Sequence, residues 1–378
     1  MSSTLLRRAR PGRCKASCLH RAYSSTPSPA ASAAEIDNAP TILPYTPPVR
    51  PSALPFKANK SRRQDSPSYI LHTFIPPQAR DAYLALRAFN LETARIADST
   101  SQPTIGAMRF QFWRDSVTAT LHLPPTTHRG GSRLSRAWLH RIISEREKYL
   151  GNRPYPALSA LETYAENTYS TFSYLTLSSL PLSSLILSSI TADHLASHIG
   201  KATGIVAVLR SLPLLGFPPP PSGGTAQGSA PHPPVLLPLD IMAAHSVQEE
   251  TILRTGPSAP GLRDAVFEDA TRANDHLITA REMLRSLLAG QGAGHAFEHE
   301  GDAQRAGYDE VQSATDVPSG KALREVEAGF GVLMGAVPTR MWLERLERVD
   351  FDVFDGRLRG PGWRLPWEAW WAFRRRRI

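Results

Sequence analysis

The feature that most restricts the fold is the stretch HIGKATGIVAVLRSLP, residues 198–213, which predicts a buried helix. Gly200 and Gly204 lie one helical turn apart, so a neighbouring helix can approach this backbone closely. The stretch therefore predicts a domain built by packing helix on helix. It ends in Arg-Ser-Leu-Pro without a carboxylate. Its apolar residues recur at helical spacing and form one stripe, Ile199, Ala202, Ile205, Val206 and Leu209.

The same helical periodicity recurs along much of the chain, and no run of alternating apolar and polar residues predicts a strand. We therefore predict an all-α protein. The expected helices span residues 77–96, 105–121, 134–150, 157–177, 183–212, 239–254, 262–288, 322–332 and 339–346.

The formal net charge of +9 suggests a nucleic-acid partner, but the distribution of the charge argues against one. Residues 1–63 carry eleven Lys and Arg against two acids, and four consecutive arginines come just before the last residue. The residues between these two ends carry a small net negative charge. We therefore predict no nucleic-acid partner.

The amino-terminal residues have the composition of a targeting segment. Residues 1–23 are rich in Arg and Ser, and the first acid of the chain is Glu35. This composition predicts a mitochondrial transit peptide, with a disordered basic tail as the alternative. Residues 24–66 are rich in Pro, Ser and Ala and predict a linker. Both cysteines, Cys14 and Cys18, lie in the leader, so the rest of the chain has no thiol for a disulfide or a metal site.

Three further segments interrupt the helical pattern. Residues 213–234 contain eight prolines, and residues 290–320 are rich in Gly, Ala, His and Asp, so both predict loop insertions. Residues 167–192 carry no charge, and a membrane span was weighed for them. Because eight of them are serines and Pro181 interrupts the run, two buried helices that meet at a proline turn explain it better.

The carboxyl-terminal segment, residues 351–378, has two explanations that the sequence leaves open. It is either a helix at a membrane surface or a tail helix packed on the core with a solvated basic end. Indole rings suit the lipid headgroup layer and arginines suit anionic lipid. The residues concerned are Trp363, Trp367, Trp370, Trp371, Arg374, Arg375, Arg376 and Arg377.

Metal and nucleophile motifs are weak in this chain. His194 and His198 lie four residues apart on a predicted helix, but no third ligand accompanies them. No Walker loop, nucleophile elbow or dinucleotide-binding glycine pattern occurs in a suitable context. We predict no metal site.

Four stretches carry a resemblance to the squalene/phytoene synthase family, and within it to the branch of mitochondrial complex I assembly factors. The resemblance covers about residues 67–350 and implies an isoprenoid-synthase-like helical bundle with a central cavity. The residues it implies at the cavity are Asn90, Glu92, Glu166, Tyr169, Gly200 and Gly204. The stretches are AFNLETARIADS (88–99), IGAMRFQFWRD (105–115), YAENTYS (164–170), and the opening stretch with LPLD (237–240) beyond it.

Active members of this family ionise an allylic diphosphate with Mg²⁺ held by two aspartate-rich motifs. In this chain the first motif matches Ala94, Arg95 and Asp98. The second follows Arg210 and matches positions from Ser211 to Leu215, where every acid is gone. The resemblance therefore implies a pseudoenzyme without catalytic residues, metal or cofactor. An active prenyl transferase, with Glu92, Asp98 and Glu166 as substitute ligands, is the alternative.

The function that the resemblance implies is assembly of respiratory complex I. Its partners would be complex I subunits or assembly intermediates, together with the lipid surface of the inner membrane. The expected location is the matrix side of that membrane, with peripheral association. A membrane-surface adaptor that works mainly through its carboxyl-terminal helix is a third hypothesis.

Overall fold

The computed structural model describes residues 65–100, 102–122, 134–180, 190–215, 235–289, 327–360 and 362–378. All of them belong to one unit, Arg50–Ile378. The predicted transit peptide, nearly all of the predicted linker, residues 216–234 of the first insertion and the whole of the second lie outside the described residues.

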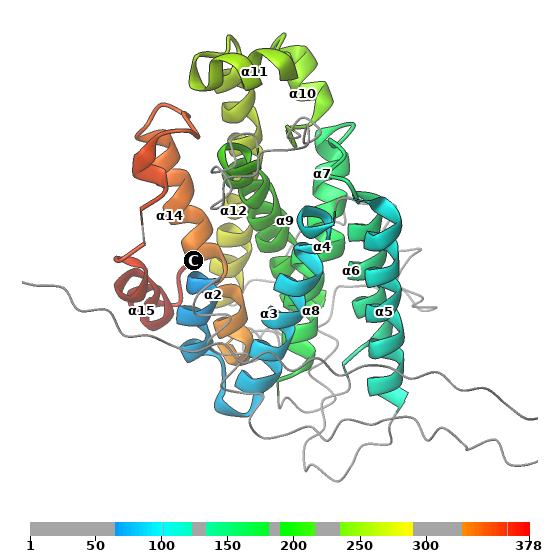
Figure 1. Cartoon of the computed structure of the whole chain (residues 1–378). Coiled ribbons are helices and arrows are strands. Elements are labelled where there is room, and N and C mark those ends of the chain that lie inside the picture. Colours follow the sequence, from blue (N-terminus) through cyan, green and yellow to red (C-terminus); the bar gives the residue numbers. More distant parts are fainter. Residues whose placement is uncertain are drawn as a thin grey trace, which may run out of the picture. The chain divides into compact units, whose positions relative to one another are not determined.

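The regular structure of these residues is helical, with no strand among them, which confirms the all-α prediction (Figure 1). Short 3₁₀ turns (His72–Phe74, Pro77–Ala79, Gly256–Ser258 and Gly356–Leu358) join some of the helices, and residues 327–333 are also helical. The α-helices are α2 Ser66–Leu71, α3 Arg80–Ala94, α4 Ile96–Ser99, α5 Pro103–His122, α6 Arg136–Lys148, α7 Leu158–Ala165, α8 Thr171–Ser178, α9 Ile190–Leu215, α10 Leu239–Ala244, α11 Glu249–Thr255, α12 Leu262–Leu288, α14 Ala336–Glu347 and α15 Leu365–Arg375.

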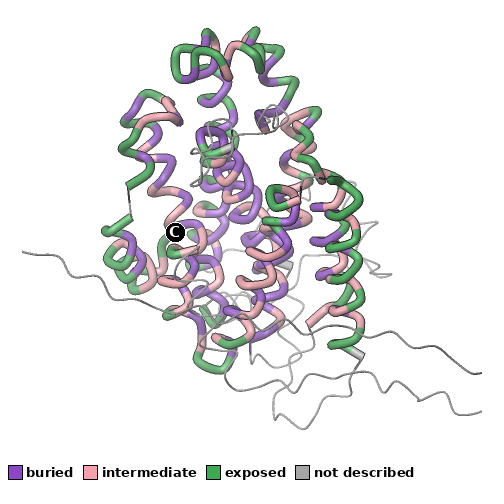
Figure 2. The backbone as a smooth tube through the Cα atoms, in the orientation of Figure 1, coloured by how far each residue is buried: buried purple, intermediate pink, exposed green. Residues whose placement is uncertain are grey.

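Helix α9 lies at the centre of the fold and packs against α7, α8, α12 and α14. Leu195, Ile205 and Leu209 of α9 are fully buried, as Figure 2 shows for the inner faces of this group of helices. A smaller apolar cluster, which includes Phe110, Ile142 and Phe172, joins α3, α5, α6 and α8. Burial of these stripes is the main force that holds the bundle together.

The two glycines of α9 allow the close approach that the sequence predicts. A Cβ atom on Gly200 would lie 2.5 Å from the backbone nitrogen of Ser170, and one on Gly204 would lie 2.4 Å from the Cβ of Ala165. The segment that approaches is the π-helical turn Glu166–Ser170 together with the end of α7. Any side chain at Gly200 would therefore force α9 and this turn apart.

Four predicted helices differ from the observed ones. The helix predicted for 77–96 is divided into a 3₁₀ turn, α3 and the first residue of α4. The helix predicted for 157–177 contains the π turn, which no local sequence rule signals. The helix predicted for 239–254 is two helices, α10 and α11, separated by a turn in which Ser246 has a φ of 54°. Helix α9 continues past its predicted end at Leu212 and includes Pro213, whose missing N–H leaves only one intrahelical bond unmade near the terminus.

Membrane crossing was considered for residues 167–192. Within the part of the chain that the structure describes, no helix is long and apolar enough to cross a bilayer. Pro181, where the two buried helices were predicted to meet, lies outside the described residues.

Candidate functional site

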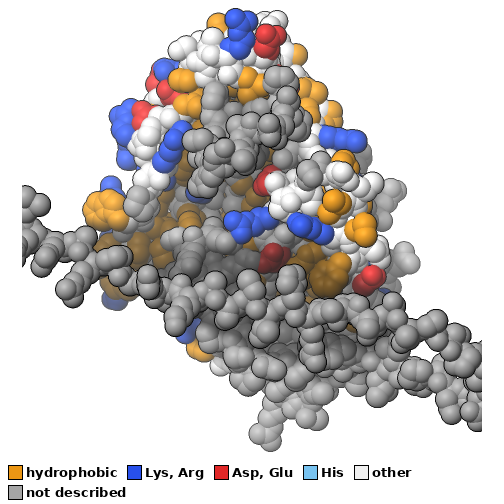
Figure 3. Space-filling view, in the orientation of Figure 1, with side chains coloured by type: hydrophobic (Ala, Val, Ile, Leu, Met, Phe, Trp, Pro, Cys, Tyr) orange, Lys and Arg blue, Asp and Glu red, His pale blue; other side chains and the backbone are white. Residues whose placement is uncertain are grey.

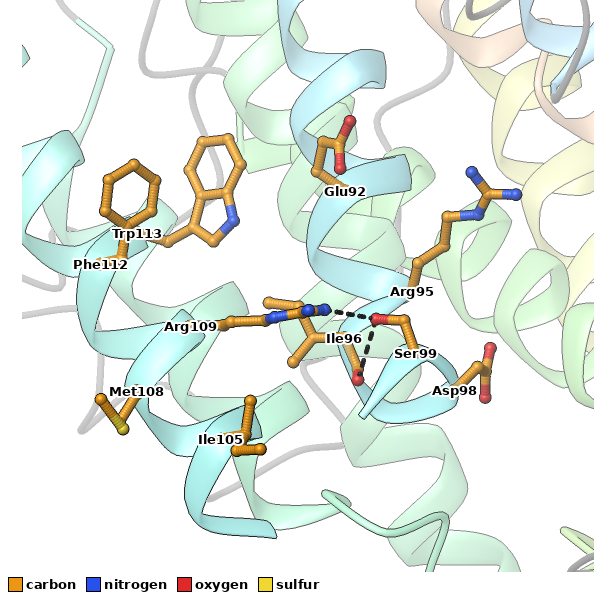
Figure 4. A pocket seen from close by; sticks show the side chains of 10 residues that line it. All are labelled: Glu92, Arg95, Ile96, Asp98, Ser99, Ile105, Met108, Arg109, Phe112 and Trp113. Atoms are coloured by element: carbon orange, nitrogen blue, oxygen red, sulfur yellow. Dashed lines mark hydrogen bonds between the residues drawn. The ribbon is translucent and has the colours of Figure 1, made fainter. Parts of the chain in front are cut away.

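A groove lies between the end of α3, the short helix α4 and the first half of α5. Its volume is about 990 Å³. Arg109 reaches from α5 and donates a hydrogen bond of 2.8 Å to the Ser99 hydroxyl, so it links the two sides of the groove (Figure 4). The side chains that line the groove are Glu92, Arg95, Ile96, Asp98, Ser99, Ile105, Met108, Arg109, Phe112 and Trp113.

The positions that match the first aspartate-rich motif lie at this groove. Ala94 is the last residue of α3 and is exposed, and Arg95 joins α3 to α4. Arg95 and Asp98 both line the groove, where Figure 4 shows them projecting away from α5. The Asp98 carboxylate accepts a hydrogen bond of 3.0 Å from the Asn152 amide. The positions matched to the first motif therefore supply one guanidinium, from Arg95, and one exposed carboxylate, from Asp98, and Glu92 adds a second carboxylate to the groove.

A buried arginine of α6 binds the last turn of α3. Arg146 of α6 is 5% exposed and donates a 2.8 Å hydrogen bond to the backbone oxygen of Asn90. It also bonds to the side chains of Asn90 and Thr93, and its guanidinium lies 5.7 Å from the Phe172 ring centre. Asn90, which we predicted at a cavity, is thus buried and serves to fix α3.

The positions of the second motif lie at the carboxyl end of α9. Arg210 is exposed, and Ser211 donates a 2.7 Å hydrogen bond to the backbone oxygen of Val208. Burial lowers the pKa of Arg345 on α14, and the nearby positive charge of Arg210 lowers it further. Leu215 is the last residue of α9. Like charges therefore meet at this end of the helix.

The remaining predicted cavity residues lie in the middle of α9 and in the π turn that packs on it. Glu166 accepts hydrogen bonds of 2.6 Å from Tyr174 and 2.7 Å from Ser197, and it lies 4.0 Å from the Lys201 ammonium. Burial raises the pKa of Tyr169 to about 12. Of the six predicted cavity residues, only Glu92 lines the groove described above.

His198 of α9 belongs to a neighbouring polar network, and the ring of His194 lies beside it, with ring centres 5.0 Å apart. His198 lies 3.0 Å from His276 of α12, nitrogen to nitrogen, and His276 lies 3.0 Å from the Glu162 carboxylate. Burial alone would raise the pKa of Glu162, but hydrogen bonds from His276 and Arg272 outweigh it and lower the pKa to about 2. Among the described residues, no group of three or more His, Cys, Asp or Glu side chains is arranged to hold a metal ion.

Sequence reasoning missed Arg109, Met108 and Phe112 as groove residues. Ile105, Met108 and Phe112 recur at spacings of three and four, so their shared helix face was readable from the sequence. The sequence did not predict that these side chains are exposed, at 42%, 72% and 65%, because an amphipathic stripe is normally assigned to the core. Arg146 had no sequence signal, since arginines are rarely buried.

Comparison with known proteins gives three findings. The squalene/phytoene synthase family matches residues 61–371 of the chain. The proteins named NADH dehydrogenase (ubiquinone) complex I, assembly factor 6, from Mus musculus and Homo sapiens are each 32% identical over 314 residues, which cover 81% of this chain and 77% of theirs. The crystal structure of a dehydrosqualene synthase in complex with a ligand is 12% identical, with a TM-score of 0.53, and the match covers 86% of this chain and 97% of that one. That structural likeness bears on the fold alone.

Proposed function

Because the chain belongs to the squalene/phytoene synthase family and its mouse and human relatives are named as complex I assembly factor 6, we propose that it assists the assembly of respiratory complex I without catalysing a synthase reaction. In this proposal the helical fold provides a surface that binds partners and does not provide an active site. The partners are complex I subunits or assembly intermediates.

One observation carries the non-catalytic part of the proposal, namely the side chains at the two motif positions. Mg²⁺ prefers carboxylate oxygens and phosphates, and a prenyl diphosphate loses its leaving group only when that charge is neutralised. The groove presents Arg95 beside Asp98, and the end of α9 presents Arg210 beside Arg345. Two arginine positions can attract a diphosphate, but they hold no metal to ionise it.

The proposed location is the matrix side of the mitochondrial inner membrane, with peripheral association. Residues 1–23 would act as the transit peptide that directs the chain there. The names of the relatives support this location because complex I is a mitochondrial assembly.

Deletion of the gene, followed by native-gel analysis of the respiratory complexes, tests the proposal. We expect complex I to be lost while the other complexes keep their levels. Reintroduction of the full chain should restore it. Intact complex I together with the loss of a sterol or carotenoid product would overturn the proposal.

An active prenyl transferase is the second candidate, and one observation favours it. Glu92 and Asp98 line the same groove, so two carboxylates remain near the first motif. Glu166, the third substitute we considered, is instead bonded to Tyr174 and Ser197. Incubation of the purified protein with farnesyl or geranylgeranyl diphosphate and Mg²⁺ separates the two candidates, since any head-to-head product establishes the transferase.

A further inference from the structure

Helix α15 is apolar on two opposite faces, and only one of them packs on the protein. Leu365 and Ala369 are 4% and 0% exposed, and Phe373 stacks near Phe74 and Phe330 with ring centres 5.0 and 5.8 Å apart. These residues recur at a spacing of four and so share one helix face. This face ties α15 to α2 and α14.

The opposite face carries indole rings. Trp367, Trp370 and Trp371 are 67%, 44% and 46% exposed, and Trp363, just before the helix, is 76% exposed. Spacings of three and four place the three helical tryptophans on one face. Hydrophobic side chains accordingly lie at the surface over α15, at the left of Figure 3. The sequence left open whether these rings pack on the core, and their exposure favours the membrane-surface explanation.

The orientation of α15 is fixed by contacts at its far end. After the helix, Arg376 adopts a left-handed conformation with a φ of 52°, which turns the chain back toward the protein. Ile378 is 7% exposed, and its backbone oxygen accepts a 3.0 Å hydrogen bond from Arg281 of α12. The buried Leu365 near the start of the helix and the bonded Ile378 after its end therefore hold the indole rings on the outer face.

Basic side chains accompany the indole rings. The guanidinium groups of Arg374 and Arg375 lie 5.6 and 4.8 Å from the ring centres of Trp370 and Trp371, and Arg377 is exposed. The one acid of the helix, Glu368, is already paired with Arg340 and Arg364. The exposed face is therefore aromatic and positively charged.

We propose that the tryptophan face of α15 is a preformed binding surface for an anionic lipid bilayer. The helix lies in the membrane plane, with its indole rings in the headgroup layer and its arginines on lipid phosphates. This inference rests on the proposed peripheral location and names the element and the lipid class responsible. Indole and guanidinium groups together on one exposed face, with Glu368 already paired, suit the headgroup layer of an anionic bilayer.

Vesicle flotation with the purified full chain tests the proposal. The probes are vesicles of phosphatidylcholine and vesicles of phosphatidylcholine with phosphatidylglycerol at about four to one. We expect strong binding to the anionic vesicles. The double variant Trp367→Ala/Trp371→Ala should bind them at least about tenfold more weakly, because two interfacial indoles are lost. Arg374→Gln/Arg375→Gln should lower the preference for anionic vesicles and weaken the salt dependence of binding, while the basic amino-terminal residues keep their share of both.

The matched control is Phe267→Ala/Ile278→Ala on α12, which removes exposed apolar side chains elsewhere, 51% and 40% exposed. It should bind vesicles as the unmodified chain does. Every variant keeps the same basic amino-terminal residues, so the differences between variants report on α15.

Equal vesicle binding by the tryptophan variant and the unmodified chain would overturn the proposal. So would a tryptophan variant that keeps vesicle binding but loses a protein partner. Either result would leave the proposed complex I role standing. Normal complex I after gene deletion would overturn that role, but it would not affect the conclusion about vesicle binding.

Discussion

The middle of α9 and its carboxyl end belong to one helix, yet their charged side chains have different surroundings. In the middle, Lys201 lies 4.0 Å from the Glu166 carboxylate, and His198 bonds to His276. At the end, Arg210 lies close enough to Arg345 to lower its pKa. Opposite charges and hydrogen bonds therefore stabilise the middle, and like charges meet at the end.

Packing differs between the two regions in the same way. Gly200 and Gly204 let the middle of α9 touch the π turn and α7, so few substitutions fit there. Arg210 and Leu214, near the end, are exposed, with Leu214 60% exposed. The middle is therefore closely packed, whereas the end presents some of its side chains to solvent. This contrast predicts that substitutions in the closely packed middle lower stability, and that substitutions at the solvent-facing positions of the end have little effect.

The largest expected effect is at Gly200. In Gly200→Ala the new Cβ would lie 2.5 Å from the Ser170 backbone, so the unfolding free energy should fall by about 3 kcal/mol. Urea denaturation followed by circular dichroism measures this. Gly356→Ala is the control, because its Cβ would meet nothing within 4 Å. Equal stability of the two variants would contradict the close contact of α9 with the π turn.

Asp269 of α12 departs from the charge pairing in the middle of α9, because both of its carboxylate oxygens are buried without a hydrogen-bond partner. Burial, followed by the charges of Asp240 and Glu268, raises its pKa from 3.8 to about 8. The folded state therefore holds a proton that the unfolded state loses above about pH 4, and stability should decrease as the pH rises toward 8.

Asp269→Asn should remove this loss and raise the unfolding free energy at pH 7.5 by about 2 kcal/mol. Denaturation at pH 5 and pH 7.5 measures the change. Asp275→Asn, on an exposed position of the same helix, should leave the pH dependence as it is. A variant that follows the pH dependence of the unmodified protein would show that Asp269 is ionised when folded.

The same substitution made at two positions of α9 compares the regions most closely. Ser197→Asp places a second carboxylate beside Glu166, where Ser197 now donates a 2.7 Å hydrogen bond, and should cost about 2 kcal/mol. Ser211→Asp places a carboxylate next to Arg210 and should change stability by less than about 1 kcal/mol. Thermal denaturation of the pair measures the difference. A larger cost at Ser211 would reverse the contrast between the two regions.

The smallest expected effect is at Glu162. Because its pKa is lowered to about 2 from 4.5, its contribution is present above about pH 4.5 and is lost as the pH falls toward 2. Glu162→Gln should therefore cost about 1 kcal/mol at pH 7, discounted for partial solvent exposure, and nothing at pH 2. Denaturation at pH 7 and pH 2 measures this. A cost that does not shrink at low pH would mean that the side chain acts through packing.

The sequence predicted the helical class, the span of α12 and the close packing at Gly200 because these depend on local periodicity and on the missing side chain of glycine. It could not predict the π turn at Glu166–Ser170, because that turn follows from how α7 and α8 pack on α9. The residues at the two motif positions could be compared with the aspartate-rich motifs of the family from the sequence alone. Burial of Arg146 and exposure of Met108 and Phe112 depend on tertiary contacts that no local pattern encodes.

The non-catalytic role is tested most directly by the complex I level in a deletion strain that carries the double variant Glu92→Gln/Asp98→Asn. These changes remove both groove carboxylates, and the Asn side chain keeps an oxygen that can accept the bond from Asn152. Complex I should return to the level that the unmodified chain restores. A complex I level as low as that of the deletion strain, from a variant that folds normally, would contradict the proposed role.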